Sequence, residues 1–245
     1  MIDIDNLNSP LLDGRKDDEE KNLEKEIEQC IREGFIAKVF GIVTYQIAIL
    51  FLVVLLGFIS DSFKRWLLES VVLYILTFLT FMVCLFAPIL KPEYYRKVPI
   101  NYILTTLFSF SFSWWIAAYT VRFTAKSVLV ALGLTVALCV IITIYAIWTK
   151  DDYTCMGGFL FSSLILLLLC SLIVFIIGIP ILNMILIYFG LILFGLYLLY
   201  DVQLTVGKGR KKFAEDDYIL AAMNIYLDLV NIFLYILDAV GERSN

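Results

Sequence analysis

The sequence is poor in the residues that build polar active sites and charged surfaces. It has no histidine, no Cys/His cluster at the spacing of metal ligands, and no Asn-x-Ser/Thr sequon. Only 17% of its 245 residues are charged, whereas a soluble domain has about 25%. Hydrophobic residues make up 61% of the chain, well above the soluble range. This composition excludes a soluble enzyme, a nucleic-acid-binding protein and a disordered chain.

The few charges that are present leave long gaps between them. Residues 1–33 hold 16 of the 42 charges, 11 acidic and 5 basic. The rest of the chain contains five charge-free windows: Val39–Ser60, Ser70–Leu90, Val98–Val121, Ser127–Thr149 and Tyr153–Tyr200. Each of the first four has 21 to 24 residues, and a helix needs about 20 to cross the hydrocarbon core. The sequence therefore predicts a membrane protein with several spanning helices.

The last window is too long for one helix, and Gly178-Ile-Pro180 divides it. A further segment, 217–240, begins at an aspartate and is then apolar except for Asp228 and Asp238. We predict an all-α membrane protein with seven transmembrane helices, the last of them central, at about 36–59, 70–90, 99–121, 127–148, 157–177, 181–205 and 217–240. A re-entrant or half-inserted helix is the alternative for 217–240, because an acid inside the membrane is costly.

Three regions follow from this division: an acidic cytosolic tail at 1–34, the seven-helix domain at 35–240, and a short C-terminal tail at 241–245. The acidic tail could dock a partner or concentrate cations, but a solvated tail that is partly helical from about residue 19 is favoured. With seven spans, 14 basic residues fall on the N-terminal side of the membrane and 5 on the other. This asymmetry predicts a cytosolic N-terminus. The five cysteines lie within spans or on the cytosolic side, so no disulfide is expected.

Two acids in the predicted spans are the candidate functional residues. Asp201 lies near the end of helix 181–205, and Asp228 lies eleven residues into helix 217–240. A charged aspartate in mid-membrane costs at least about 2.5–3.5 kcal/mol, so its default interpretation is functional. Asp228 belongs to a polar stripe with steps of 4, 3, 4 and 3 residues, which we predict to face the pore: Asn224, Asp228, Asn231, Tyr235 and Asp238.

The sequence does not guarantee that the two acids meet, but we predict that their carboxylates approach within hydrogen-bond reach in at least one state. If the two helices end at the same level, the depths of Asp201 and Asp228 differ by roughly 10 Å, and helix tilt can reduce this. Two carboxylates in contact titrate as a coupled unit and attract a hard divalent cation. The alternative for Asp201 is an interfacial acid neutralised by the basic residues at 208–212.

The same residues resemble the transmembrane Bax inhibitor motif family, and its Lifeguard branch in particular. The resemblance rests on the segments at 200–207 and 215–237, the 27-residue step between the two acids, and the segments Arg96–Asn101 and Thr149–Thr154. It implies a seven-helix protein of the endoplasmic reticulum, Golgi or related membranes that leaks calcium and restrains cell death. It also implies that Asp201 and Asp228 form the pH-sensing pair, and that Arg96 or Lys97 latches the first acid. An acid that some relatives carry in their third helix is absent here, where the chain has serines at 109, 111 and 113.

The expected function is a pH-sensitive calcium leak channel of intracellular membranes that lowers stored calcium and restrains apoptosis. Its expected contacts are the lipid bilayer, calcium, protons and other membrane regulators of cell death, with no cofactor, no nucleic acid and calcium only as a permeant ion that Asp201 and Asp228 bind transiently. The plasma membrane and other endomembranes are alternative locations. Two alternative functions are a scaffold for cell-death regulators and an intramembrane aspartyl protease. The protease is disfavoured because that class has Gly-x-Gly-Asp at the second acid, whereas this chain has Ile225-Tyr-Leu-Asp228. The bulky Tyr226 and Leu227 would block the close approach of a substrate strand.

Overall fold

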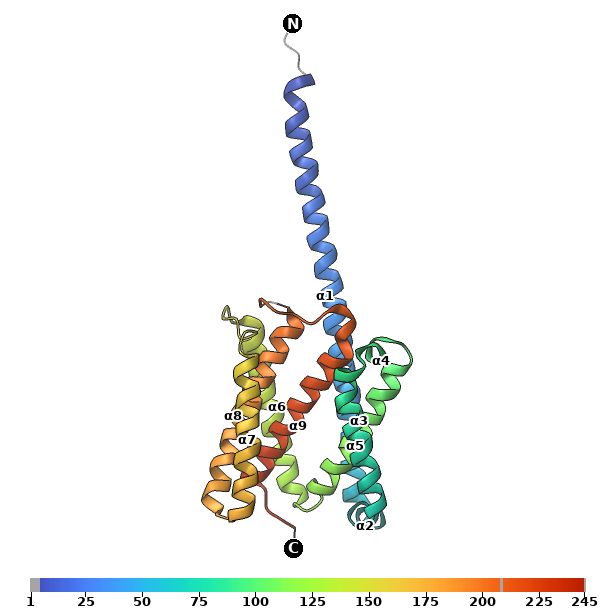
Figure 1. Cartoon of the computed structure of the whole chain (residues 1–245), viewed down its shortest axis with the longest axis vertical. Coiled ribbons are helices and arrows are strands. Elements are labelled where there is room, and N and C mark those ends of the chain that lie inside the picture. Colours follow the sequence, from blue (N-terminus) through green and yellow to red (C-terminus); the bar gives the residue numbers. More distant parts are fainter. Residues whose placement is uncertain (1–4, 208, 245) are drawn as a thin grey trace.

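The chain is a bundle of helices with one very long member. The computed structural model describes residues 5–207 and 209–244, with side chains from residue 19 onward except that of Ile89. Within these residues the regular structure is helical, apart from one isolated bridge between Phe123 and Arg243. The helices (Figure 1) are α1 Asp5–Ile59, α2 Asp61–Glu69, α3 Val71–Leu90, α4 Pro92–Arg96, α5 Ile100–Thr120, α6 Ala125–Trp148, α7 Gly157–Ile177, α8 Pro180–Val206 and α9 Tyr218–Val240, with a 3-10 turn at Glu215–Asp217.

The first helix differs from the sequence prediction. We expected a tail that becomes partly helical near residue 19 and a separate span at 36–59, but α1 continues without a break from Asp5 to Ile59. It projects far beyond the other helices (Figure 1). Phe35 is the first buried residue among the side chains described. Residues 1–4 of the predicted tail, and the side chains of residues 5–18, lie outside the described residues.

Six of the seven predicted spans are helices long and apolar enough to cross a membrane. The predicted all-α membrane fold is confirmed, but the count of seven is not. The exception is α5, which has 21 residues but includes many polar ones, among them the buried side chains of Asn101, Thr105, Ser109, Ser111 and Ser113. These residues lower its hydropathy while it packs between α1 and α3. The last predicted span is the continuous helix α9.

The central position of α9 is confirmed. In its most apolar window 61% of the residues are buried, against 28% or less in the other five candidate spans. It packs against α1, α6 and α8, with smaller contacts to α4 and α5, while α3 lies outside α5 and α7 lies outside α8. Figure 1 shows α9 crossing the bundle obliquely, from the end nearest the α1 extension toward the far end of α8.

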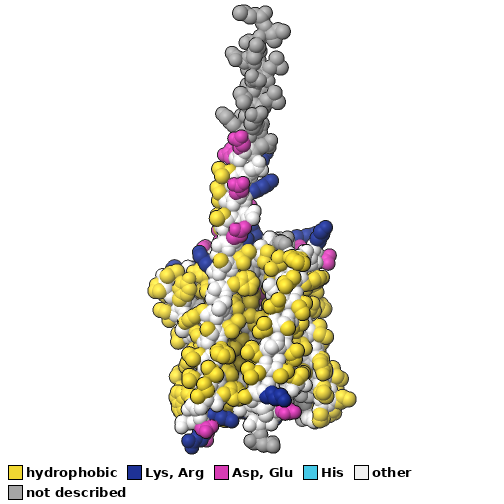
Figure 2. All heavy atoms as spheres, turned by 180° about the vertical axis from the view of Figure 1, so that it is seen from behind, with side chains coloured by type: hydrophobic (Ala, Val, Ile, Leu, Met, Phe, Trp, Pro, Cys, Tyr) yellow, Lys and Arg dark blue, Asp and Glu magenta, His cyan; other side chains and the backbone are white. Residues whose placement is uncertain are grey.

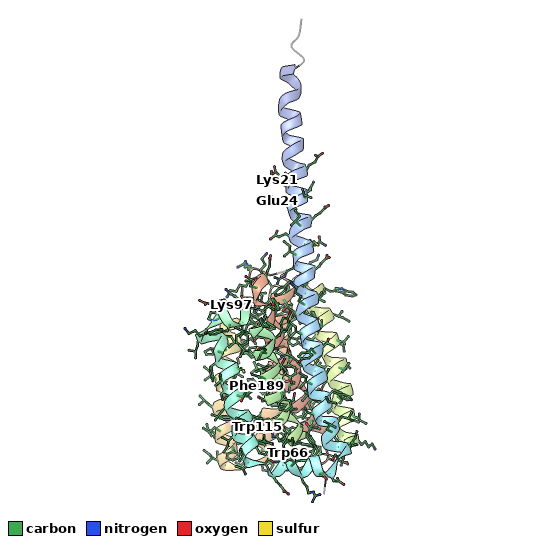
Figure 3. All side chains as sticks on the ribbon, turned by 90° about the vertical axis from the view of Figure 1, so that its right-hand side faces the viewer. Lys21, Glu24, Trp66, Lys97, Trp115 and Phe189 are labelled. Carbon is green, nitrogen blue, oxygen red and sulfur yellow. The ribbon has the colours of Figure 1, made fainter. Side chains whose placement is uncertain are left out.

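The outer surface of the bundle is apolar along its length. Large hydrophobic side chains are exposed on the outward faces of α3, α6, α7 and α8, and Figure 2 shows charged side chains gathered at the two ends of the body. Lys97 lies at the end from which α1 projects, and Trp66 lies near the opposite end (Figure 3). Burying this apolar band in a lipid bilayer removes it from water, and the charged ends remain hydrated.

The break predicted within the longest apolar window is confirmed. The helix α7 ends at Ile177, and Gly178 follows in the left-handed conformation with φ of 73°. Glycine adopts this conformation without the steric cost that a Cβ imposes. Pro180 is then the first residue of α8, where its missing N–H group costs no hydrogen bond. The turn therefore makes α7 and α8 antiparallel neighbours.

Candidate functional site

The two candidate acids meet in the interior of the bundle. Asp201 and Asp228 are each 4% exposed, and their side chains are joined by a hydrogen bond. The loop after α8 leads to the side of α4 and α1, where α9 begins. Because α9 then returns obliquely toward α8, each of its residues descends by less than the 1.5 Å of an upright helix. This tilt reduces the depth difference that the sequence left open, and in the structure the two acids are in contact.

Few groups of the surrounding helices face the acid pair. Asn224, one turn before Asp228, donates a side-chain hydrogen bond to Asp201. Tyr197 on α8 lies close to both acids, and Cys139 on α6 lies close to Asp228. The Oδ2 atom of Asp228 is buried and has no hydrogen-bond partner within the described part of the chain. The pair is therefore enclosed by polar but uncharged groups.

No basic side chain neutralises the pair among the residues that the structure describes. The ion pairs found there involve other acids, and no cation contributes to the electrostatic surroundings of Asp201 or Asp228. The alternative of an interfacial Asp201 balanced by the basic loop is therefore not supported by residues 210–212, and Lys208 lies outside the described residues. Two carboxyl groups in contact with no counter-ion can share a proton, but both can ionise only against strong mutual repulsion.

The pair alone is a small ligand set for a metal. In the described chain, no group of three or more cysteines, aspartates or glutamates could hold a metal ion. Asp201, Asp228 and the amide oxygen of Asn224 could supply a few oxygen ligands, whereas calcium takes about six to eight. Water would have to complete the shell, so the geometry fits a transient contact better than a tight site.

Arg96 occupies a different position from the one implied by the family resemblance. Its Nε and Nη2 atoms donate to the Oδ1 and Oδ2 atoms of Asp217, at 2.8 and 3.2 Å. The contact raises the pKa of the Arg96 guanidinium, chiefly through these hydrogen bonds. Lys97 lies 3.8 Å from Glu93 on the surface. Neither residue contacts Asp201 in this structure; Arg96 instead holds the turn that leads into α9.

A second contact fixes the same end of α9 from within. The side-chain amide of Asn101, at the start of α5, donates to the hydroxyl of Tyr218 at 2.7 Å. This pair could not be predicted from the sequence, because nothing in either segment indicates that the two residues, 117 positions apart, are in contact. Together, Arg96 and Asn101 attach the first turn of α9 to the segment that joins α3 and α5.

The side chains of the predicted polar stripe of α9 make several separate contacts and do not follow one open path. Asn224 binds Asp201, and the side-chain amide of Asn231 donates a hydrogen bond to the carbonyl of Leu227 at 2.8 Å. Tyr235 stacks on Phe194 of α8 with ring centroids 5.8 Å apart. Asp238, which is exposed, accepts a hydrogen bond from the hydroxyl of Tyr119 on α5. Their role as pore-facing residues remains a prediction.

The end of α8 is tied to the loop between α6 and α7. The side-chain oxygen of Gln203 accepts from the backbone N–H of Tyr153 at 2.8 Å, and its amide nitrogen donates to the carbonyl of Asp151 at 2.9 Å. Gln203 is buried and lies two residues after Asp201. The motif at 149–154 is visible in the sequence, but its partner is not. Its partner is the helix that carries the first acid.

Asp152 in the same loop holds the segment after α8. Its carboxylate accepts hydrogen bonds from the backbone N–H and hydroxyl of Thr154, at 2.9 and 2.5 Å, and from the backbone N–H of Arg210 at 3.0 Å. These bonds, that from the Thr154 hydroxyl first, lower the pKa of Asp152. The α6–α7 loop and the α8–α9 loop therefore form one connected surface at the end of the bundle from which α1 projects.

Comparison with known proteins identifies the family of this chain. The family model described as "Inhibitor of apoptosis-promoting Bax1" matches residues 32–245. Protein lifeguard 3 of Homo sapiens is 28% identical over 218 residues, covering 87% of this chain and 70% of that protein. The Mus musculus protein of the same name is also 28% identical, over 71% of its length. Bax inhibitor 1 of Schizosaccharomyces pombe is 30% identical over 221 residues, covering 90% of this chain and 80% of that protein. With a family match that spans nearly the whole bundle, both acids included, this chain belongs to the Bax inhibitor family of membrane proteins.

Proposed function

We propose that this protein is a pH-sensitive leak channel for calcium in intracellular membranes, which lowers stored calcium and thereby restrains apoptosis. The observation that carries the proposal is the contact between Asp201 and Asp228, buried between α8 and α9 without a counter-ion. The names of the matching family and of the yeast relative support the restraint of apoptosis. In this proposal the protein acts without catalysing a reaction.

The proposed gate works through electrostatic repulsion. While the two carboxyl groups share a proton, a hydrogen bond holds α8 against α9 at the centre of the bundle. Loss of that proton leaves two like charges in contact, and in a medium of low dielectric constant their repulsion is large. Separation of the helices relieves it and lets water reach the unpartnered Oδ2 of Asp228. Protonation is thereby linked to helix packing, as a pH-sensitive gate requires.

Calcium suits the separated pair. Carboxylate oxygens are the ligands that hard divalent cations prefer, and a site with few protein ligands keeps much of the ion's water. A cation can then enter and leave, which conduction requires. The N-terminus faces the cytosol in this proposal, on the basis of the 14 to 5 distribution of basic residues. The endoplasmic reticulum and the Golgi are the proposed locations.

A scaffold that binds other regulators of cell death is the second candidate. The observation in its favour is the α1 extension, where Leu23, Ile27 and Ile31 are 57%, 51% and 43% exposed at intervals of four residues. Such spacing places them on one face of the helix, and Figure 2 shows exposed hydrophobic side chains there. A partner helix could cover this face, and its binding would not require the acid pair.

Calcium release from liposomes that contain only the purified protein tests the channel directly. Flux is measured from about pH 5 to pH 8 for the unaltered protein, Asp201→Asn and Asp228→Asn. Asparagine keeps the size and hydrogen-bonding capacity of the acid but cannot ionise, so each variant should flatten the pH dependence. Asp61→Asn, at an exposed acid of α2, is the matched control. A normal pH profile in both variants, or no flux in the unaltered protein, would reject the channel and favour the scaffold.

A further inference from the structure

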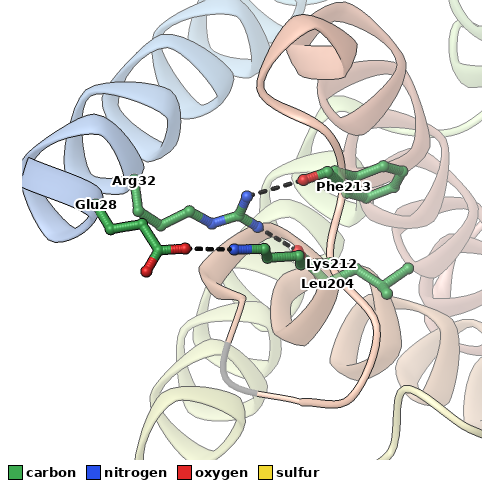
Figure 4. Close-up of polar contacts among 5 residues, drawn as sticks. All are labelled: Glu28, Arg32, Leu204, Lys212 and Phe213. Carbon is green, nitrogen blue, oxygen red and sulfur yellow. Dashed lines mark hydrogen bonds and ion pairs between the residues drawn. The ribbon is translucent and has the colours of Figure 1, made fainter. Parts of the chain in front are cut away.

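Arg32 of α1 reaches across to the end of α8. Its Nη2 atom donates to the carbonyl of Leu204 at 2.5 Å, and its Nη1 atom donates to the carbonyl of Phe213 at 2.9 Å (Figure 4). The guanidinium lies over the ring of Phe35, 4.5 Å from the centroid. One planar side chain thus joins three segments of the chain: the α1 extension, the last turn of α8, and the loop before α9.

The carbonyl groups that Arg32 binds belong to a helix end. The last carbonyls of a helix lack partners within it, and a positive charge there also interacts favourably with the helix dipole. Leu204 lies three residues after Asp201, and its carbonyl also accepts from the backbone N–H of Phe213 at 3.3 Å. Arg32 therefore fixes the turn of α8 that immediately follows the first acid.

Gly207 provides the space for this contact. It ends α8 in the left-handed conformation, with φ of 76°. A Cβ atom at this position would lie 2.8 Å from the Nε of Arg32, closer than van der Waals contact permits. A substitution here would displace the guanidinium without removing its charge, which offers an independent way to break the contact.

A weaker ion pair lies beside Arg32. Glu28, one turn earlier in α1, lies 3.3 Å from the Nζ of Lys212 (Figure 4), and both side chains are largely exposed. Exposed pairs contribute little to stability because water and salt screen them. Glu215 also faces Arg32 electrostatically. An open cleft of about 620 Å³ adjoins these residues. Arg210, Lys211 and Lys212 are exposed, so the loop offers cleavage sites to trypsin.

We infer that Arg32 is a positioning residue for the acid pair, through which the α1 extension sets the pH at which the pair responds. Gln203 holds the end of α8 on one side, against the α6–α7 loop, and Arg32 holds it on the other. Releasing Arg32 frees the last turn of α8, so that Asp201 and Asp228 separate more readily. The titratable groups that face the pair, Tyr197, Tyr200 and Cys139, are not altered by a substitution of Arg32. This inference rests on the proposed proton-sensing role of the pair but not on calcium conduction.

The first part of the test measures how firmly the loop is held. Purified protein is digested briefly with trypsin, and mass spectrometry quantifies cleavage after Arg210, Lys211 and Lys212. Cleavage reports the population of the opened loop, and loss of a charge-assisted hydrogen bond changes such a population by about tenfold. We expect that increase in Arg32→Gln and in Gly207→Ala, a smaller one in Arg32→Lys, and little change in Glu28→Gln. Unchanged cleavage in both Arg32→Gln and Gly207→Ala would overturn the inference.

The second part measures the acid pair without any calcium flux. The infrared carboxylic-acid band of the pair, assigned with Asp201→Asn and Asp228→Asn, is followed from about pH 5 to pH 8. In Arg32→Gln its midpoint should move to lower pH by about half a unit or more, and Arg32→Lys should restore part of the shift. Faster cleavage with an unchanged midpoint would leave Arg32 a merely structural residue and reject the inference. A band that does not titrate in the unaltered protein would reject it as well, whereas a shifted midpoint in a protein that conducts no calcium would reject only the channel.

Discussion

At the scale of single residues, the acid pair behaves as one unit and not as two independent groups. The carboxyls of Asp201 and Asp228 share a hydrogen bond in a buried site that contains no counter-ion among the described residues. Protons on such a pair belong to both groups, so that removing either carboxyl removes the coupled titration. Substitutions of Asp201 and of Asp228 should therefore have non-additive effects on any property that depends on this titration.

The first prediction follows from this coupling. Asp201→Asn and Asp228→Asn should each flatten the pH dependence of calcium flux, and the double variant should do little more. A double-mutant cycle on the flux at both ends of the pH range measures the interaction. Additive effects of the two substitutions would mean that the acids titrate independently, and would contradict a gate built from their contact.

The second prediction concerns Arg96. It is based on the observed contact of Arg96 with Asp217. It does not depend on the contact with Asp201 that the family resemblance implies. Since its pKa is raised above an already high value, Arg96 stays charged throughout the physiological pH range. Arg96→Ala should loosen the start of α9 and raise basal calcium flux without moving the pH midpoint.

Asp217→Asn separates the two possible partners of Arg96. If the contact seen here is the functional one, Asp217→Asn should raise basal flux as Arg96→Ala does. Lys91→Ala, which removes an exposed positive charge at the same end of the bundle, serves as the control. An effect of Arg96→Ala without any effect of Asp217→Asn would show that Arg96 acts elsewhere, with Asp201 as the first candidate.

At the scale of helices, close packing of α8 on α9 depends on a small residue. A Cβ atom at Gly190 would collide with the ring of Tyr235, which also stacks on Phe194. Gly190→Ala should therefore lower stability by about 1–3 kcal/mol, the usual cost of overpacking. Thermal unfolding in detergent micelles measures the change. Gly195→Ala on the same helix is the matched control, because a Cβ there would lie 3.4 Å from Ile142; equal destabilisation by the two substitutions would contradict this account.

The hydrogen bonds that Asp152 accepts from Thr154 and Arg210 give a prediction with a defined pH range. Hydrogen bonds from Thr154 and Arg210 lower its pKa in the folded protein. A lowered pKa means that the stabilisation is present above the ordinary aspartate value of about 4. It is lost only as the pH falls through the lowered value. Between about pH 5 and pH 8 the stabilisation by the Asp152 carboxylate is constant, so it cannot produce the pH response of the acid pair.

Asp152→Asn should accordingly weaken the loop contact throughout the range from about pH 5 to pH 8. Tryptic cleavage after Arg210 should increase, because the amide accepts fewer hydrogen bonds than the carboxylate. The midpoint of the infrared band of the acid pair should stay within about 0.2 units of the unaltered value. Asp151→Asn, at the exposed neighbouring acid, is the control. A large midpoint shift in Asp152→Asn would indicate that this loop also positions Asp201.

The helices show what the sequence could and could not predict. The charge-free windows located the spans to within a few residues, because the cost of a charge in the membrane applies to each segment separately. The continuity of α1 was missed, since its polar first half carries no membrane signal. The contacts of Arg32 and Arg96 were also missed. Their partners are 172 and 121 residues away, and only the fold brings such segments together.

At the scale of the whole molecule, one end of the bundle gathers the segments that hold α8 and α9. The α1 extension contributes Arg32, the α6–α7 loop contributes Asp152, and the segment before α5 contributes Arg96. Each of these contacts lies outside the apolar band and within reach of water. The acid pair lies deeper, one turn below Leu204. The molecule thus places its titrating groups in the interior and the contacts that restrain them at one membrane surface.

The orientation of that surface is the last prediction. Most basic residues lie at the end from which α1 projects, and they predict that this end faces the cytosol. Cys30 and Cys155 are both exposed there, so a membrane-impermeant thiol reagent should label them only from the cytosolic side. A cysteine introduced as Asp61→Cys, on α2 at the other end, should be labelled only from the opposite side. Labelling of Cys155 from the lumen would show that the protein has the opposite orientation. Arg32, Asp152 and Arg96 would then face the lumen and not the cytosol.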